Sequence, residues 1–213
     1  MYEGFYGLQE RPFALLPDPS FLFLSKGHST ALTLLRYSIL NRQGFTVVSG
    51  EVGSGKTTLI NRLLDEMKSG VTVGLINFTT RSFGEMAEWI MMAYGLPYKN
   101  KSKVELYDDF VQFMIREYAA GRPVVLIVDE AQNLGIRGLE EIRMLSNVNA
   151  QKDPLLHVIL VGQPELRSLL QAPQLRQLTQ RVSVAFHLRP LTDEEVEQYI
   201  VHRVTHAGGS PDL

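Results

Sequence analysis

Short apolar runs alternate with longer amphipathic stretches along most of the chain. Five runs rich in β-branched residues are nearly continuous in apolar character, as strands covered on both faces are: residues 45–49, 71–77, 123–128, 156–161 and 182–188. Apolar positions at three- and four-residue spacing predict helices at 28–42, 55–68, 82–94, 104–119, 137–147 and 164–171. Strands separated by helices predict an α/β three-layer sandwich with a central parallel sheet.

Two of the predicted helices can be described in more detail. The helix at 104–119 is expected to turn one apolar face toward the core, made by Val104, Tyr107, Phe110, Val111 and Ile115. A last helix should begin after Thr192, because Thr192 and Glu195 have the spacing of a capping box.

The first 27 residues differ from the rest of the chain. Aromatic residues and prolines are dense there: Tyr2, Phe5, Tyr6, Phe13, Phe21 and Phe23, with Pro12, Pro17 and Pro19. Proline at this density argues against a helix. We expect residues 1–27 to form a linker whose aromatics pack on a core domain of residues 28–190; the alternative is that they line a ligand pocket.

Composition narrows the class of protein. The chain has 213 residues, a net charge of −2 and no cysteine. A disulfide framework, a thiol nucleophile and a cysteine metal site are therefore excluded, and wholesale electrostatic wrapping of nucleic acid is disfavoured. The sequence contains no apolar run near the ~18 residues of a membrane span, and its start lacks the order of a signal peptide. We expect a cytoplasmic protein.

The segment Gly50-Glu-Val-Gly-Ser-Gly-Lys-Thr matches the phosphate-binding pattern G-x-x-x-x-G-K-[ST], between a predicted strand and a predicted helix. Its glycines allow the backbone N–H groups to turn inward, and the helix dipole favours phosphate. Lys56 can reach the β- and γ-phosphates of ATP, and the Thr57 hydroxyl can bind Mg²⁺. The predicted nucleotide contacts are Gly50, Glu51, Val52, Gly53, Ser54, Gly55, Lys56, Thr57 and Thr58.

A second phosphate-site element should be an acidic residue at the end of another strand. Asp129 and Glu130 follow the run Val-Val-Leu-Ile-Val. Asp129 would hold Mg²⁺ through water, and Glu130 would orient and deprotonate the attacking water. The adjacent glutamate favours hydrolysis over a kinase reaction, since a hydrolase needs a base for water.

Three further stretches carry a family resemblance: Phe5-Tyr-Gly-Leu with Arg11-Pro-Phe and Pro17-Asp-Pro, then Leu160-Val-Gly-Gln-Pro-Glu-Leu, then Leu175-Arg-Gln-Leu-Thr-Gln-Arg. With the Walker A motif at 50–57 and Walker B at 124–130, nearly the whole chain resembles the general secretion pathway protein A (ExeA-like) ATPases of the AAA+ class. Relatives of this family include ATPases encoded with pilus, secretion and polysaccharide-export systems, and transposition helper ATPases.

The resemblance implies further roles. Gln163 stands at the sensor-1 position and would hold the lytic water or the γ-phosphate; the alternative is a Gln-Pro turn that opens a helix. Arg181, or alternatively Arg176, stands where an arginine finger acts on a neighbouring subunit, unless it makes a helix-end salt bridge. His28 lies in the region that flanks adenine, although a lone histidine there is more often a surface or capping residue.

The resemblance also implies a helical lid, which would start near Leu191. Residues 191–213 hold little more than one helix, so we expect an incomplete lid, weak ATP binding and slow hydrolysis. With a complete lid the resemblance implies a homo-oligomer, such as a hexamer, that works with a secretion or envelope-assembly protein at the cytoplasmic face of the inner membrane.

Two other functions stay open. One is a DNA-transaction helper, which would use a basic surface; the densest cluster, Lys99-Asn-Lys-Ser-Lys103, has the composition of a solvated loop. The other is a nucleotide-gated scaffold with little turnover. His202 and His206 have i,i+4 spacing but lack a third ligand in the sequence pattern, so we expect no metal site there.

Overall fold

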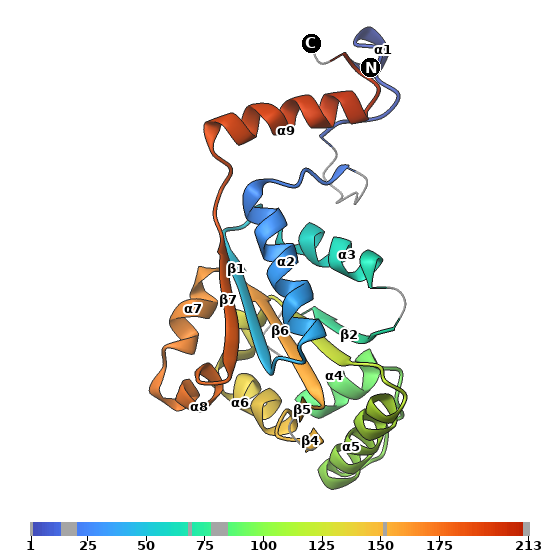
Figure 1. The fold of residues 1–213 in the computed structure, drawn as a ribbon, viewed down its shortest axis with the longest axis vertical. Helices are drawn as coiled ribbons and strands as arrows, with labels where there is room; N and C mark the ends of the chain where they lie inside the picture. The colour runs from blue at the N-terminus through green and yellow to red at the C-terminus, as the bar shows by residue number, and fades with distance from the viewer. Residues whose placement is uncertain (1, 14–20, 68–69, 78–84, 151–152, 211–213) are drawn as a thin grey trace.

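A central sheet of five parallel strands organises the protein (Figure 1). The computed structural model describes residues 2–13, 21–67, 70–77, 85–150 and 153–210. The strand order is β2-β3-β6-β1-β7, and the bounds are β1 Phe45–Gly50, β2 Thr72–Asn77, β3 Val124–Asp129, β6 Leu156–Gly162 and β7 Val182–Leu188. Each lies within one residue of a predicted strand, which confirms the three-layer α/β prediction.

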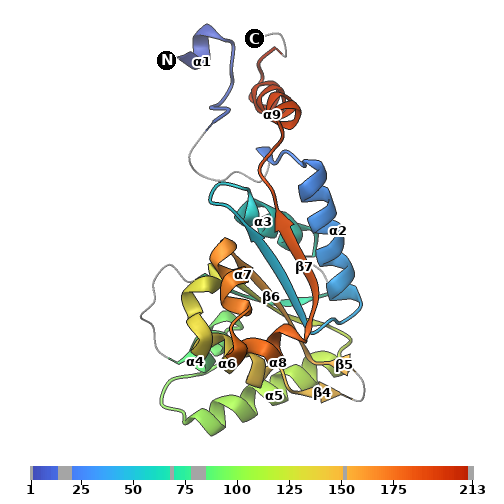
Figure 2. The same ribbon diagram turned by 90° about the vertical axis from the view of Figure 1, so that its left-hand side faces the viewer.

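Helices cover both faces of the sheet (Figure 2). One face carries α2 (Lys26–Leu40) and α3 (Lys56–Glu66). The other carries α4 (Met86–Ala93), α5 (Lys103–Ala119), the 3₁₀ turn η2 (Ala131–Leu134), α6 (Gly135–Leu145), α7 (Pro164–Leu170), η3 (Pro173–Leu175) and α8 (Arg176–Thr179). Because all five strands are parallel, their carboxyl ends meet at one edge of the sheet, where a ligand site is expected.

Two buried clusters follow the two faces. The larger lies beneath α4 to α8 and includes Phe45, Leu126 and Leu160 from the sheet; the smaller lies beneath α2 and α3 and includes Val125 and Ile159. Neighbouring residues of a strand thus enter opposite clusters. This explains why the strands show nearly continuous apolar runs rather than alternation.

The apolar face predicted for α5 is wrong in part. Val104 is 77% exposed, and Tyr107 and Ile115 are also exposed. The buried side chains are instead Leu106, Phe110, Phe113 and Met114. Both sets have helical spacing, and the ring of Tyr94 packs against Phe110 and Phe113, which selects the face with the two phenylalanines.

The N-terminal segment lies along the last helix, α9 (Asp193–His206), at the end of the molecule away from α5 (Figure 1). Phe21 packs against His206, and Phe23 against Tyr199 and His202. Phe21 and Phe23 therefore contact α9 rather than the sheet-and-helix core, while packing of the whole segment 1–27 on the core domain stays a prediction. Their partners are on α9 because that helix exposes an aromatic and aliphatic side while the core faces are already covered by helices.

Smaller elements complete the chain. A short helix, α1 (Tyr2–Phe5), contradicts the expectation of no helix in the N-terminal segment; it ends before Pro12, so no proline interrupts it. An antiparallel strand pair, β4 (Asn149–Ala150) with β5 (Asp153–Pro154), was not indicated by the sequence pattern. Pro17, Pro19 and the start of the helix predicted at 82–94 lie outside the described residues. Within the described part of the chain, no helix is long and apolar enough to cross a membrane.

Candidate functional site

The glycine-rich loop connects β1 to α3 at the carboxyl edge of the sheet. Gly55 caps α3 with a φ of +85°, and a Cβ there would lie 2.5 Å from Nε2 of His28. Both the backbone conformation and the space therefore require glycine at this position. The loop is thus shaped by its sequence to expose the N-terminus of α3, which is a site for an anionic group.

Lys56 points into this loop. Its side chain is only 7% exposed, and its ammonium group donates hydrogen bonds to the carbonyl oxygens of Gly50 and Glu51, both at 2.8 Å. A buried cation is thereby held at the centre of the loop by groups that a phosphate oxygen can replace as acceptor.

Thr57 and Asp129 join the loop to the end of β3. The Thr57 hydroxyl donates to Oδ2 of Asp129 at 3.3 Å, and Oδ1 of Asp129 accepts from the backbone N–H of Glu130 at 2.9 Å. Burial raises the pKa of the Asp129 carboxyl above its ordinary value. Two hard oxygen donors at a phosphate loop fit Mg²⁺, which binds through one or two protein oxygens with water and substrate phosphates.

Glu130 follows in a left-handed backbone conformation, with φ 53° and ψ 38°. Its Oε2 accepts hydrogen bonds from the side-chain amides of Gln132 and Gln163, the latter at 3.1 Å. The structure thus brings three of the predicted residues, Asp129, Glu130 and Gln163, to one edge of the sheet with Lys56. Gln132 was not predicted as a site residue.

His28 is buried under the loop rather than on the surface. Its Nε2 lies 3.0 Å from the carbonyl oxygen of Ser54, and its Nδ1 lies 2.8 Å from the hydroxyl of Ser25, the N-cap of α2. Because a carbonyl oxygen only accepts, Nε2 carries the proton of the neutral ring. Burial lowers the pKa of His28, which keeps the ring neutral next to the phosphate loop.

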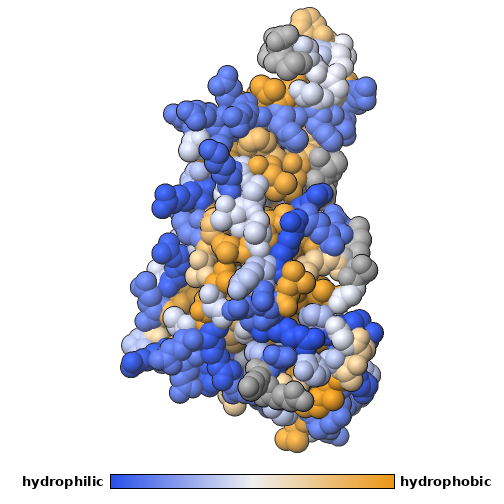
Figure 3. All heavy atoms as spheres, in the orientation of Figure 1, coloured by the Kyte–Doolittle hydropathy of each residue, from blue (hydrophilic) through white to orange (hydrophobic). Residues whose placement is uncertain are grey.

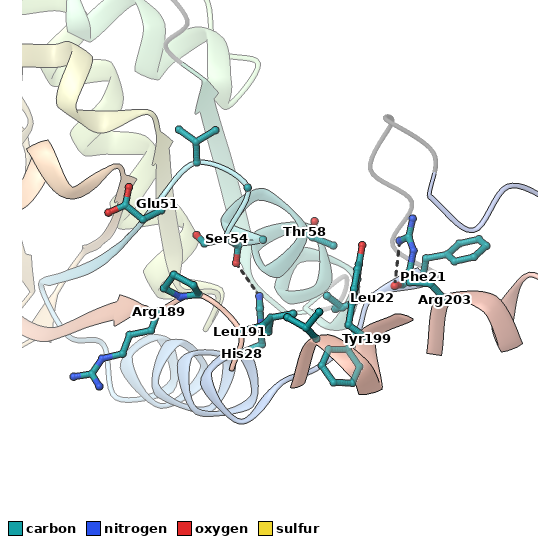
Figure 4. Close-up of a pocket in the computed structure, with 16 residues that line it drawn as sticks. Phe21, Leu22, His28, Glu51, Ser54, Thr58, Arg189, Leu191, Tyr199 and Arg203 are labelled. Carbon is teal, nitrogen blue, oxygen red and sulfur yellow. Dashed lines mark hydrogen bonds between the residues drawn. The ribbon is translucent and has the colours of Figure 1, made fainter. Parts of the chain in front are cut away.

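A cavity of about 520 Å³ adjoins the loop, in the size range of small-molecule sites (Figure 4). Glu51, Val52, Gly53, Ser54, Gly55 and Thr58 line it on one side. The opposite wall consists of Phe21, Leu22 and Phe23 from the N-terminal segment, with Leu191, Val196, Tyr199 and Arg203. Of the two roles considered for the N-terminal aromatics, lining a pocket is therefore the one that Phe21 and Phe23 have.

Arg203 fastens the N-terminal segment to α9. Its guanidinium lies 4.6 Å from the ring centre of Phe21 and donates to the backbone carbonyls of Pro12 and Phe21. Figure 3 shows hydrophobic atoms between α9 and the rest of the molecule on the face in view. The segment and α9 therefore form one wall, which suits a planar apolar group such as a nucleobase.

The predicted arginines lie elsewhere. Arg181 directly precedes β7, whose first residue pairs with Phe45 at the start of β1, so it sits at the edge of the sheet opposite the phosphate loop. Arg181 and Arg176 are both exposed. The structure does not bring either arginine to the site of its own chain, and an action on a neighbouring subunit stays a prediction.

Sequence reasoning missed Gln132, Tyr199 and Arg203. Gln132 lies two residues after Glu130, and this short spacing was the available signal. Tyr199 and Arg203 have i,i+4 spacing on α9, but their contacts depend on a segment more than 170 residues earlier, which periodicity does not reveal. Among the described residues there is no group of three His, Asp or Glu side chains arranged to hold a metal.

Comparison with known proteins places these features in a family context. A family model described as an AAA domain matches residues 39–170. The General secretion pathway protein A of Aeromonas hydrophila is 37% identical over 209 residues, 98% of this chain. The chain spans only 38% of that relative's length.

Solved structures support the fold. The ORC2 protein of Aeropyrum pernix, in ADPNP–ADP complexes, matches with a TM-score of 0.67 at 18% identity, covering 93% of this chain and 56% of that chain. Cdc6p from Pyrobaculum aerophilum matches with a TM-score of 0.63 at 19% identity, covering 91% and 54%. At these identities the likeness extends to the fold alone.

Proposed function

The chain belongs to the AAA-domain family of P-loop ATPases, and from that premise we propose that it binds ATP with Mg²⁺ at residues 50–58 and hydrolyses the terminal phosphoanhydride. The supporting observation is the hydrogen bond between Thr57 and Asp129, which joins the phosphate loop to the end of β3 beside the 520 Å³ cavity. The triphosphate of ATP bound at this loop would then have the cavity on one side, which takes the adenine, and Glu130 on the other side, which faces the attacking water.

Each residue has a defined task in this proposal. Lys56 pairs with the β- and γ-phosphates, and Thr57 and Asp129 would hold the Mg²⁺, which neutralises charge that develops on the phosphate oxygens. Glu130 accepts the proton of the attacking water. Gln163 donates from its amide beside that carboxylate and orients the water or the γ-phosphate. The aromatic rings of Phe21, Phe23 and Tyr199 enclose the adenine of ATP.

Two substitutions separate binding from hydrolysis. Lys56→Ala should abolish ATP binding, measured by calorimetry, whereas Glu130→Gln should bind normally and hydrolyse about 10²- to 10⁴-fold more slowly. Lys103→Ala is the matched control, because Lys103 pairs with Glu85 on the surface, at 2.9 Å. Equal binding by Lys56→Ala and wild type would contradict the proposal.

The relative's name points to a cellular role. We place the ATPase in a homo-oligomer at the cytoplasmic face of the inner membrane, where its nucleotide state would control assembly of an envelope secretion, pilus or polysaccharide-export machine. ATP-loaded Glu130→Gln should then hold an envelope protein in a persistent complex that Lys56→Ala never forms. A complex that persists while wild-type turnover is negligible would instead favour the nucleotide-gated scaffold.

A DNA-transaction helper is the alternative, since one structural neighbour is an ORC1 protein solved in complex with DNA. The surface argues against it. Lys101 pairs with Asp109 and Lys103 with Glu85, so much of the lysine cluster at 99–103 is neutralised within the chain. DNA binding that weakens steeply with salt would favour this alternative.

A further inference from the structure

Gln132 connects the proposed general base to the neighbouring strand. It lies in η2, directly after β3, while Gln163 directly follows β6, and β3 and β6 are adjacent in the sheet. The Gln132 amide nitrogen donates to Oε2 of Glu130, and its Oε1 accepts from the backbone N–H of Gln163 at 3.1 Å. One side chain thus contacts both partners of the base.

The two contacts fix which way the Gln132 amide points. The backbone N–H of Gln163 can only donate, so the oxygen of the Gln132 amide must face it. The NH₂ group must then face the Glu130 carboxylate, which can only accept when ionised. The backbone N–H of Gln163, after β6, therefore fixes the orientation of the Gln132 amide. That orientation in turn sets the hydrogen bond from Gln132 to the Glu130 side chain, after β3.

The surrounding backbone leaves room for this arrangement and for little else. A Cβ at Gly162 would lie 2.5 Å from Oε1 of Gln132, so only glycine there admits the amide. Glu130 itself has a left-handed backbone, which non-glycine residues rarely adopt outside sites where the surroundings enforce it. The glycine at position 162 and the left-handed backbone of Glu130 both restrict the local conformation, and both help to hold the Gln132 and Glu130 side chains in place.

We propose that Gln132 is a positioning residue for Glu130, which holds the carboxylate of the base in register with Gln163. The inference rests on the proposed ATP hydrolysis. Gln132 donates one of the two side-chain amide hydrogen bonds that Oε2 receives and, through Gln163, ties the carboxylate to the end of β6. Without Gln132, Oε2 of Glu130 keeps, among the described side chains, the Gln163 amide alone, and the carboxylate samples orientations that do not face the water.

A double-mutant cycle tests whether Gln132 acts through Glu130. Gln132→Leu should lower kcat about 10- to 100-fold with KM for ATP unchanged, because it removes a contact to the base and none to the nucleotide. In a Glu130→Gln background the same substitution should lower residual turnover no further. If Gln132 had a purely structural role, its substitution would lower turnover by a similar factor in both backgrounds. Gln112→Leu, on the exposed side of α5, is the matched control.

A second variant separates donation from bridging. Gln132→Glu keeps an oxygen for the Gln163 N–H but cannot donate to Glu130 when ionised, so it should be at least as slow as Gln132→Leu. Wild-type kcat in Gln132→Glu at pH 8 would overturn the inference, since it would show that bridging alone suffices.

A nucleotide-free measurement tests the contacts of Gln132 separately from turnover. In ¹⁵N-labelled protein, the side-chain amide resonances of Gln163 should shift in both Gln132→Leu and Glu130→Ala while the backbone spectrum stays folded. Unchanged resonances would overturn the contact itself. Absence of turnover in the wild type would overturn the proposed function and this role together, whereas wild-type turnover that Gln132→Leu leaves intact would overturn this inference alone.

Discussion

The imidazole of His28, in the first turn of α2, lies 3.0 Å through Nε2 from the carbonyl oxygen of Ser54 in the phosphate loop (Figure 4). On its other side Nδ1 meets the hydroxyl of Ser25, which caps the same helix. Both ring nitrogens of His28 therefore have hydrogen-bond partners, and the buried ring packs against the phosphate loop. Its role is to hold the shape of the loop, and the space it fills is the space that Gly55 leaves open.

His28→Ala should weaken ATP binding about tenfold, because it leaves the Ser54 carbonyl without a buried donor and opens a cavity under the loop; the loss corresponds to about 1.4 kcal/mol. Calorimetric titration with ATP measures it. His28→Gln can offer an amide N–H to the same oxygen and should recover part of the affinity. Full affinity in His28→Ala would contradict a supporting role.

Asp129→Asn should stabilise the nucleotide-free protein by about 1 kcal/mol, because replacing a functional group that is unfavourable for folding commonly raises stability. The same variant should lose Mg²⁺-dependent turnover. The carboxyl's folded pKa is raised by burial, so its favourable contribution exists at low pH and is lost as pH rises through that pKa. The stability difference between variant and wild type should therefore close as pH falls. Urea unfolding at neutral and acid pH measures both; a variant less stable at neutral pH would refute the prediction.

His157 should make stability depend on pH far from the site. Its ring is buried at the start of β6, with Nδ1 facing the Gln43 carbonyl and Nε2 3.3 Å from the Ser38 hydroxyl. Burial lowers its pKa from 6.5 to about 4. As pH falls, the His157 ring binds a proton in the unfolded chain at a higher pH than in the folded protein. The free energy of unfolding should therefore fall by about 3 kcal/mol from its value above pH 6.5 to its value at pH 4.

The comparison with His157→Gln isolates this contribution, because the burial-lowered pKa values of His28 and His202 act in the same direction in both proteins. Urea unfolding at several pH values between 4 and 7.5 should give a shallower pH dependence for the variant. Parallel curves for the two proteins would exclude His157 as the cause.

The sequence predicted the sheet well, and it placed the phosphate-binding pattern between a strand and a helix, because both depend on local signals. Buried parallel strands need apolar β-branched runs, and the loop needs glycine, lysine and threonine at fixed spacing. Pocket lining by the N-terminal aromatics was one of two roles considered from the sequence, but their pairing with α9 could not be predicted, because Phe21 meets Arg203 across most of the chain. The face of α5 was misjudged because the predicted set and the buried set, Leu106, Phe110, Phe113 and Met114, both have helical spacing, and the packing of Tyr94 against Phe110 and Phe113 distinguishes the two faces.

Arg181 offers a test of assembly. Its place at the amino edge of the sheet, before β7, keeps it from the phosphate loop of its own chain. If it contacts ATP at all, it does so on a neighbouring copy through a head-to-tail interface. Arg181→Ala should then lower turnover about 10³-fold or more, and wild-type ATPase activity should rise faster than linearly with protein concentration. Arg176→Ala examines the other candidate in the same assay.

Mixing two inactive variants decides whether the arginine acts between chains. An Arg181→Ala subunit keeps its own Glu130, and a Glu130→Gln subunit keeps its own Arg181, so interfaces between them can join a working base to a working finger. Random mixing at equal amounts should restore up to about a quarter of wild-type activity, since one pairing in four is competent in a head-to-tail contact. Arg181→Lys should restore little in place of arginine, because lysine lacks the planar fork. If no ratio of the two variants recovers turnover, Arg181 is not a finger acting in trans.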